Sequence, residues 1–177
     1  TIITPSQWLA NLVQASFLGR FKVQVIHNGI NLSVFRPTPS GFRQDHGLEN
    51  ARLILAGASE WARRKGLDDL IQLSSMLEPP YRLVVVGLND RQWQRFPQEV
   101  VCIPKTSRVE ELVQIYSAAD VFINPTLEEN FPTVNLEALA CGTPVITYPT
   151  GGSPESIDDK TGVVLQQKSP DELLDAL

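Results

Sequence analysis

Several motifs that commonly mark an active site are absent from this chain of 177 residues. It has no GxGxxG fingerprint, no phosphate-binding loop ending in Gly-Lys-Ser/Thr and no HExxH pair. Dinucleotide oxidoreduction, nucleoside-triphosphate hydrolysis and zinc proteolysis therefore lose their usual sequence support. An Asp-x-Asp pair is also missing, which disfavours a transferase that chelates a metal-bound diphosphate. A phosphate ligand would need cationic side chains and backbone amides instead.

Cysteine, positive charge and long apolar runs are also scarce. Cys102 and Cys141 are too few for a disulfide scaffold and lack metal-site spacing, so we expect reduced, packed thiols. A net charge of −5 gives no general attraction for nucleic acid or an anionic membrane. No apolar run approaches the roughly 18 to 20 residues of a membrane span, and no targeting segment opens the chain. These properties predict a cytoplasmic protein that binds no nucleic acid.

The residues that are present predict one α/β domain over residues 1–177. Short apolar runs typical of strands buried on both faces alternate with apolar stripes of helical period. The expected strands cover residues 23–26, 53–56, 83–86, 121–123, 145–147 and 163–165. The expected helices carry stripes over residues 9–17, 67–77 and 109–116. This alternation favours a Rossmann-like, doubly wound parallel sheet with helices on both faces, which binds ligands at the carboxyl ends of its strands. Residues 36–50 are the expected flexible loop.

A cationic run, Arg63-Arg64-Lys65, directly precedes Gly66 and the helical stripe that begins at Leu67. Cations at a helix N-terminus oppose the helix dipole, and a bound anion would reverse that penalty. The run follows the strand over residues 53–56, which places it at the edge of the sheet where ligands bind. The alternative is a solvated charge run that acidic residues in the following turn compensate.

A second helix start lies at Phe131-Pro132-Thr133-Val134. Proline is favoured at the first helical position, so the amides of Thr133 and Val134 are expected to be free for an anion. Glu129 then falls in the preceding loop, and Glu137 falls within the helix.

Glu137 lies in a helix that is apolar almost all round, and a buried ionised carboxylate is unfavourable without a partner. One alternative is a structural role, as a salt bridge to a core arginine or a cap for neighbouring backbone. The other is that Glu137 accepts hydrogen bonds from ligand hydroxyls, such as a ribose diol. His27 and His46 are expected to be strand-end and loop residues, and Trp8 is expected to pack.

Seven stretches, in order along nearly the whole chain, resemble the donor-binding half of the group 1 (family 4) retaining glycosyltransferases of GT-B fold. They are residues 4–8 (TPSQW), 28–30 (NGI), 35–37 (FRP), 64–67 (RKGL), the pair Glu129 and Glu137, 140–145 (ACGTPV) and 151–155 (GGSPE). Within this family, residues 129–132 (ENFP) are similar to a variant of bacterial exopolysaccharide and lipopolysaccharide enzymes. The chain begins at Thr1 without a methionine and stops at Leu177 within an expected helix, so we expect an excerpt of a longer enzyme.

The resemblance implies a role for each matching residue. Glu129 would contact the donor sugar near the reacting centre, and Glu137 would bind the ribose. Lys65 would neutralise the diphosphate. The remaining expected contacts to the donor are with Arg64, with Ile103 and Pro104 beside the base, and with Asn130, Phe131, Pro132, Thr133 and Val134 at the loop and helix start. Lys65 and Glu129 are the expected catalytic residues, and no metal or other cofactor is implied.

The sequence departs from the family pattern at two places in this site. Gly57-Ala58-Ser59 stands where the family commonly has a Gly-Arg pair, so a second cation for the diphosphate would have to come from Arg63 or Arg64. Asn130-Phe131-Pro132 replaces the commoner Gly-Phe-Gly, which stiffens the loop and removes one amide.

The expected function is donor binding in transfer of a sugar from a nucleoside diphosphate sugar to an acceptor, in bacterial cell-surface polysaccharide biosynthesis. The partners implied are the nucleotide sugar and a glycan or lipid-linked acceptor, the latter bound through an N-terminal domain outside this chain. Peripheral association of the full-length enzyme with the inner face of the membrane stays open. The alternatives are a non-catalytic nucleotide-sugar-binding module and a sugar-nucleotide epimerase of the same fold.

Overall fold

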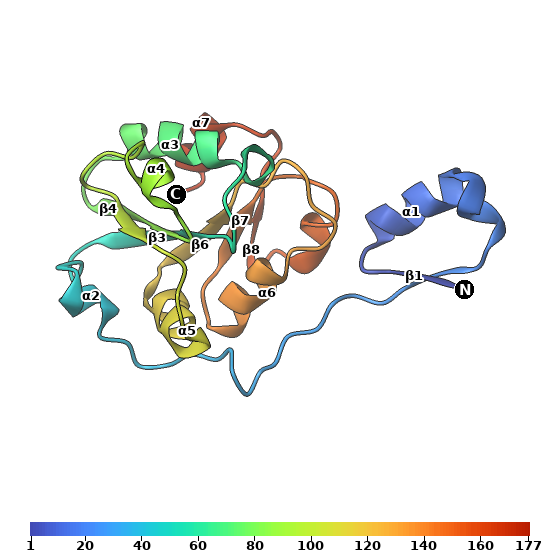
Figure 1. Cartoon of the computed structure of the whole chain (residues 1–177), viewed down its shortest axis with the longest axis horizontal. Helices are drawn as coiled ribbons and strands as arrows, with labels where there is room; N and C mark the ends of the chain where they lie inside the picture. The colour runs from blue at the N-terminus through green and yellow to red at the C-terminus, as the bar shows by residue number, and fades with distance from the viewer.

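The computed structural model describes all residues, 1–177, and contains two separate sheets (Figure 1). The larger sheet has six parallel strands in the order β5-β4-β3-β6-β7-β8. Its strands are β3 (Arg52–Gly57), β4 (Tyr81–Val86), β5 (Val101–Ile103), β6 (Val121–Asn124), β7 (Val145–Thr147) and β8 (Gly162–Val164). The chain moves outward from β3 to β5 and then returns to the other side of β3. The carboxyl ends of β3 and β6 therefore flank a topological switch point, where doubly wound sheets bind ligands.

Helices cover both faces of this sheet, as the sequence pattern predicts (Figure 1). One face packs against α3 (Leu67–Met76) and α7 (Pro170–Asp175), and the other against α5 (Val109–Ala118) and α6 (Thr133–Ala140). Alternate residues of β3 serve the two cores, with Ile54 in the first and Leu55 in the second, and both are fully buried. The short helix α4 (Asp90–Trp93) follows β4. None of the helices combines the length and apolar character needed to cross a bilayer.

The expected flexible loop over residues 36–50 is instead packed against the domain. It contains the short helix α2 (Phe42–Asp45), and Phe42 and Leu48 are buried in the core beneath α5. Arg43 donates hydrogen bonds to the carbonyl of Ala118 at 2.8 Å and to Asp120 at 2.7 Å. The prediction was wrong because two apolar residues six positions apart do not form a periodic pattern.

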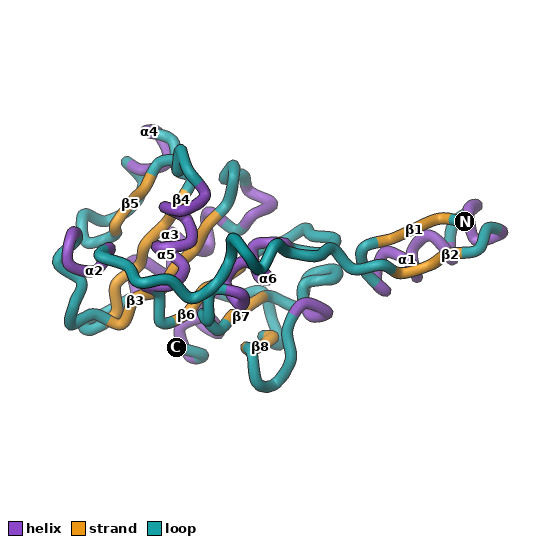
Figure 2. The backbone as a smooth tube through the Cα atoms, turned by 90° about the horizontal axis from the view of Figure 1, so that it is seen from below, coloured by secondary structure: helices purple, strands orange, loops and turns teal.

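The first strands form a small parallel βαβ arrangement, which we call the N-terminal unit, at one end of the molecule (Figure 2). It comprises β1 (Ile2–Thr4), α1 (Gln7–Ala15), the 3-10 helix η1 (Phe17–Arg20) and β2 (Val23–Val25). The strand predicted over residues 23–26 therefore lies outside the main sheet, because β2 pairs with β1. Two strands and one helix cannot enclose a core, and Phe17 is 83% exposed.

Candidate functional site

A close approach between two loops positions Lys65. The 3-10 helix η2 (Arg63–Lys65) ends at Gly66, whose φ of +76° is in the left-handed region. A Cβ at Gly66 would lie 2.0 Å from the carbonyl oxygen of Pro125, so only glycine lets this turn contact the loop after β6. The amide of Leu127 donates to the Arg64 carbonyl at 2.8 Å and fixes the contact. The carboxyl ends of β3 and β6 thereby bring Lys65 beside Glu129.

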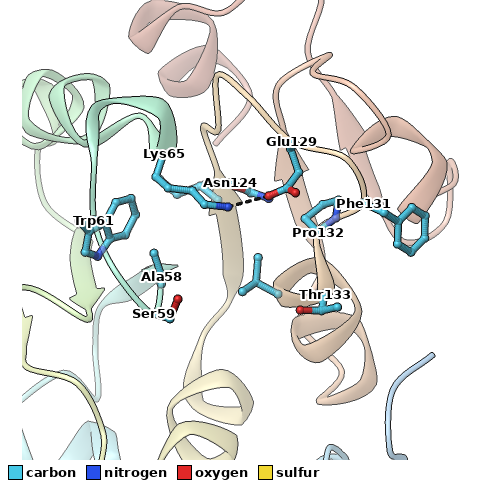
Figure 3. Close-up of a pocket in the computed structure, with 12 residues that line it drawn as sticks. Ala58, Ser59, Trp61, Lys65, Asn124, Glu129, Phe131, Pro132 and Thr133 are labelled. Carbon is cyan, nitrogen blue, oxygen red and sulfur yellow. Dashed lines mark hydrogen bonds and ion pairs between the residues drawn. The ribbon is translucent and has the colours of Figure 1, made fainter. Parts of the chain in front are cut away.

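Lys65 and Glu129 form an ion pair across the first cavity, a hollow of about 240 Å³ that the residues after β3 and β6 line (Figure 3). Lys65 Nζ lies 2.6 Å from Glu129 Oε2, and the two side chains are 22% and 16% exposed. The floor includes Gly57, Ala58 and Asn124. Each charged group therefore neutralises the other.

The N-terminus of α6 opens into the same cavity. Pro132 is the N-cap residue and Thr133 the first helical residue, one position later than the sequence predicted. No side chain caps this end of the helix, and the amides of Thr133 and Val134 have no hydrogen-bond partner. Both residues line the cavity. Free amides at the positive end of a helix dipole, close to a lysine, form a binding site for an anion such as phosphate.

A buried polar network holds α6 in place. Asn124 at the end of β6 donates from Nδ2 to Asn135 Oδ1 at 2.8 Å, and Asn135 donates to Ser156 Oγ at 2.9 Å. Asn135 is fully buried, and Ser156 in turn donates to the carbonyl of Ser153. The network joins the helix that carries the free amides to the sheet. The network was not predicted, although Asn135, a polar residue in a largely apolar helix, was a signal for it.

The second cavity, of about 260 Å³, lies on the other side of the α6 N-terminus. It shares residues 57–59, Thr133 and Val134 with the first cavity and extends to Glu137, Tyr116 and Lys105. The two cavities therefore adjoin at the α6 N-terminus, and we refer to the adjoining pair as the channel. A ligand bound at the amides would have Glu137 on one side and Glu129 on the other.

Glu137 has a protein partner, but it is not the arginine that the structural alternative suggested. Tyr116 Oη donates to Glu137 Oε2 at 3.0 Å. Burial raises the pKa of the Glu137 carboxyl, and hydrogen bonds from Tyr116 and Thr133 only partly oppose that shift. Glu137 lines the second cavity. Because a carboxylate can accept several hydrogen bonds, it remains able to bind ligand hydroxyls.

Four of the predicted site residues lie outside the two cavities, namely Arg64, Ile103, Pro104 and Asn130. Lys105 and Thr106 line the second cavity where Ile103 and Pro104 were expected, because the Ile103 carbonyl already accepts bonds from the amides of Gly87 and Leu88. The sequence signal for Lys105 and Thr106 as lining residues was their position shortly after β5, which ends at Ile103. Arg64 does not supply the missing second cation in the first cavity.

Arg64 lies instead on the third cavity, a more open hollow of about 690 Å³ between Trp8 and the loop over residues 127–130. Asn130, whose amide donates to Glu129 Oε1 at 2.9 Å, also lines it, as do Glu129 and Lys168. Neither Arg64 nor Lys168 forms an ion pair with a carboxylate. Glu129 lines both the first and the third cavity, and the third cavity, which Glu128 also lines, borders the N-terminal unit at Trp8.

A doubly wound sheet with free helix amides and a lysine at its switch point is typical of domains that bind phosphorylated ligands. The particular family follows from comparison with known proteins. Residues 41–177 match the family model described as "Glycosyl transferases group 1". The chain belongs to this family.

Similar proteins include D-inositol 3-phosphate glycosyltransferases of Actinosynnema mirum, 32% identical over 177 residues, and of Mycobacteroides abscessus, 29% identical over 171 residues. Each alignment covers 88% of this chain but only 42% and 38% of the relatives, so the chain spans about two fifths of their length. Among solved structures, the sucrose-phosphate synthase of Thermosynechococcus elongatus has a TM-score of 0.84 at 27% identity, over 98% of this chain and 47% of that one. The structure of Anabaena HepE in complex with UDP-glucose has a TM-score of 0.80 at 22% identity, over 98% of this chain and 51% of that one, which supports the fold.

Proposed function

We propose that this chain is the donor-binding domain of a retaining glycosyltransferase of the family 4 type. It would hold a nucleoside diphosphate sugar while the sugar is transferred to an acceptor. The observation that carries the proposal is the channel formed by the first and second cavities, with Lys65 and Glu129 at one end, the free α6 amides in the middle and Glu137 at the other end. The binding of UDP-glucose by Anabaena HepE supports a nucleotide sugar as the ligand.

The proposed chemistry is electrostatic. As the bond to the anomeric carbon breaks, negative charge grows on the leaving nucleoside diphosphate, and Lys65 with the amides of Thr133 and Val134 would stabilise it. No metal is needed in this proposal. Glu129 would accept hydrogen bonds from the sugar and orient it, without acting as a covalent nucleophile. Because Lys65 and Glu129 pair with each other, donor binding would replace that contact with one from Lys65 to the diphosphate and one from Glu129 to the sugar.

The acceptor would bind through an N-terminal domain beyond this chain, and bacterial cell-surface glycans or lipid-linked sugars are the class we propose. The third cavity supports a second candidate, a phosphorylated polyol, because Arg64 and Lys168 line it and form no ion pair, although Glu128 and Glu129 line it too. The name of the similar D-inositol 3-phosphate glycosyltransferases agrees with that candidate.

A thermal-shift panel of UDP, GDP, ADP and their glucose or mannose conjugates tests the proposal. We expect one nucleotide and its sugar conjugate to raise the Tm at millimolar concentration, and we expect Lys65→Met to reduce both shifts. If no nucleotide in the panel raises the Tm of the wild-type chain, the proposal is wrong.

A further inference from the structure

A carboxylate of the main domain holds the first helix of the N-terminal unit. Glu155, in the 3-10 helix η3 (Pro154–Ser156), accepts hydrogen bonds from the amides of Gln7 at 2.7 Å and Trp8 at 2.8 Å. The helix α1 has no acidic residue in its own first turn, so Glu155 provides the negative charge that its N-terminus favours. One side chain thereby fixes where α1 begins relative to the main domain.

The Glu155 carboxylate is connected to a residue of the first cavity through the rings of His27 and Phe131. His27 Nε2 lies 3.3 Å from Glu155 Oε2. The imidazole ring stacks on Phe131, with centroids 4.8 Å apart and planes at 19°. Phe131 is 6% exposed, lines the first cavity and immediately precedes Pro132, the N-cap of α6 (Figure 3). The contacts therefore run from α1 through Glu155 and His27 to the residue before the anion site.

A second, parallel contact joins the same two regions. Gly152 lies so close to both that an added Cβ would be 2.6 Å from the Cβ of Ser6 and 2.0 Å from the carbonyl oxygen of Asn130. A Cβ at Gly151 would lie 1.8 Å from the carbonyl oxygen of Glu129. The loop of residues 151–152 thus lies between the start of α1 and the loop that carries Glu129. It packs closely against both sides, and a side chain at either glycine would clash with them.

We propose that Glu155 is a positioning residue that couples the orientation of the N-terminal unit to the occupancy of the donor cavity. Binding that orders Phe131 and the Glu129 loop would also stabilise the bonds from Glu155 to α1. The third cavity, which Trp8 borders, would take its shape at the same time. The ligand part of this inference rests on the proposed function. Thermodynamic linkage requires the effect to be reciprocal.

Amide hydrogen exchange at Gln7 and Trp8 tests the inference, together with titration of UDP-glucose, GDP-mannose and ADP-glucose. We expect Glu155→Gln to accelerate exchange at both amides and to weaken binding of the sugar conjugate about fivefold or more. In the wild-type chain, that conjugate is expected to slow exchange at the same two amides.

The matched control is Glu172→Gln. Glu172 also accepts from two backbone amides, those of Gln166 at 2.8 Å and Gln167 at 2.6 Å, but lines neither donor cavity. It is expected to leave the sugar-conjugate affinity unchanged. If Glu155→Gln accelerates exchange but binds the conjugate as tightly as the wild type, the coupling is absent.

A third variant tests, without any ligand, whether Phe131 is linked to α1 through His27 and Glu155. Phe131→Leu removes the ring that His27 stacks on and is expected to accelerate exchange at Gln7 and Trp8 in the empty protein. Unchanged exchange in this variant would overturn the inference even if nucleotides bind. If no nucleotide binds the wild type, the proposed function and the ligand part of the coupling fail together, and the Phe131 variant still decides whether the link exists.

Discussion

Neutralising Glu129 is expected to strengthen binding of a nucleoside diphosphate that lacks a sugar and to weaken binding of its sugar conjugate. In the empty site, Lys65 Nζ is held by Glu129 Oε2 at 2.6 Å. A diphosphate that recruits Lys65 must disrupt this pair. With glutamine at position 129, the lysine is more readily available, but the proposed sugar contact loses its charge.

The size of the effect follows from how exposed the pair is. Exposed pairs contribute about 0.2–1 kcal/mol, whereas loss of one partner from a fully buried pair costs about 3–5 kcal/mol. At 22% and 16% exposure this pair lies between the two. We take about 2 kcal/mol for it and about 1 kcal/mol for the hydrogen bond that glutamine retains from the Lys65 ammonium group. The difference of about 1 kcal/mol corresponds to about fivefold tighter binding of the nucleoside diphosphate.

Isothermal titration of UDP, GDP and ADP into the wild type, Glu129→Gln and Glu128→Gln measures the effect. Glu128 is exposed, forms no ion pair and carries the same charge, so its variant controls for the change in net charge. We expect only the Glu129 variant to gain about fivefold beyond this control. Equal affinities in the two variants would refute the reasoning.

Three further predictions concern the ribose site, a loop contact and a buried thiol. Because burial raises the pKa of Glu137 in the folded chain, its ionised form opposes folding above that pKa, and the penalty disappears as the pH falls and the carboxyl protonates. In calorimetry, Glu137→Gln should therefore raise the Tm of the ligand-free chain more at pH 7 than at acidic pH. The same variant should bind a nucleoside diphosphate about tenfold more weakly. A lower Tm than the wild type at pH 7 would contradict the stability prediction. Gly66→Ala places a Cβ 2.0 Å from the carbonyl oxygen of Pro125 and should lower the free energy of unfolding, measured in urea, by about 2–5 kcal/mol. The control is Gly29→Ala, whose added Cβ has nothing within 4 Å and which should change this free energy little. Burial raises the pKa of the Cys102 thiol to about 11, so iodoacetamide at pH 8 should label it only after unfolding, and rapid labelling of the native chain would contradict its burial.

Much of the fold could be predicted because buried parallel strands read as short apolar runs. All six runs identified in the sequence overlap strands of the structure, and the expected helices flank them on both faces. The N-terminal unit could not be separated from the main sheet in this way. Its strands β1 and β2 have three residues each, and a run of residues does not specify which other strand it pairs with.

The positions of the site residues were predictable where local sequence determines them, and not where contacts between distant residues determine them. The start of α6 was identified to within one residue, because proline and the apolar run after it are local signals. The bond between Tyr116 and Glu137 joins residues 21 positions apart on separate helices, so no spacing rule reveals it. Arg64 lines the third cavity and not the first, and this too depends on contacts between segments far apart in the sequence.

The most direct test of the account is a crystal structure of the chain with the nucleoside diphosphate that raises its Tm most. The account predicts the diphosphate between Lys65 Nζ and the amides of Thr133 and Val134, with ribose hydroxyls on Glu137 and the base near Lys105. A nucleotide bound elsewhere, for example between Arg64 and Lys168 in the third cavity, would contradict it.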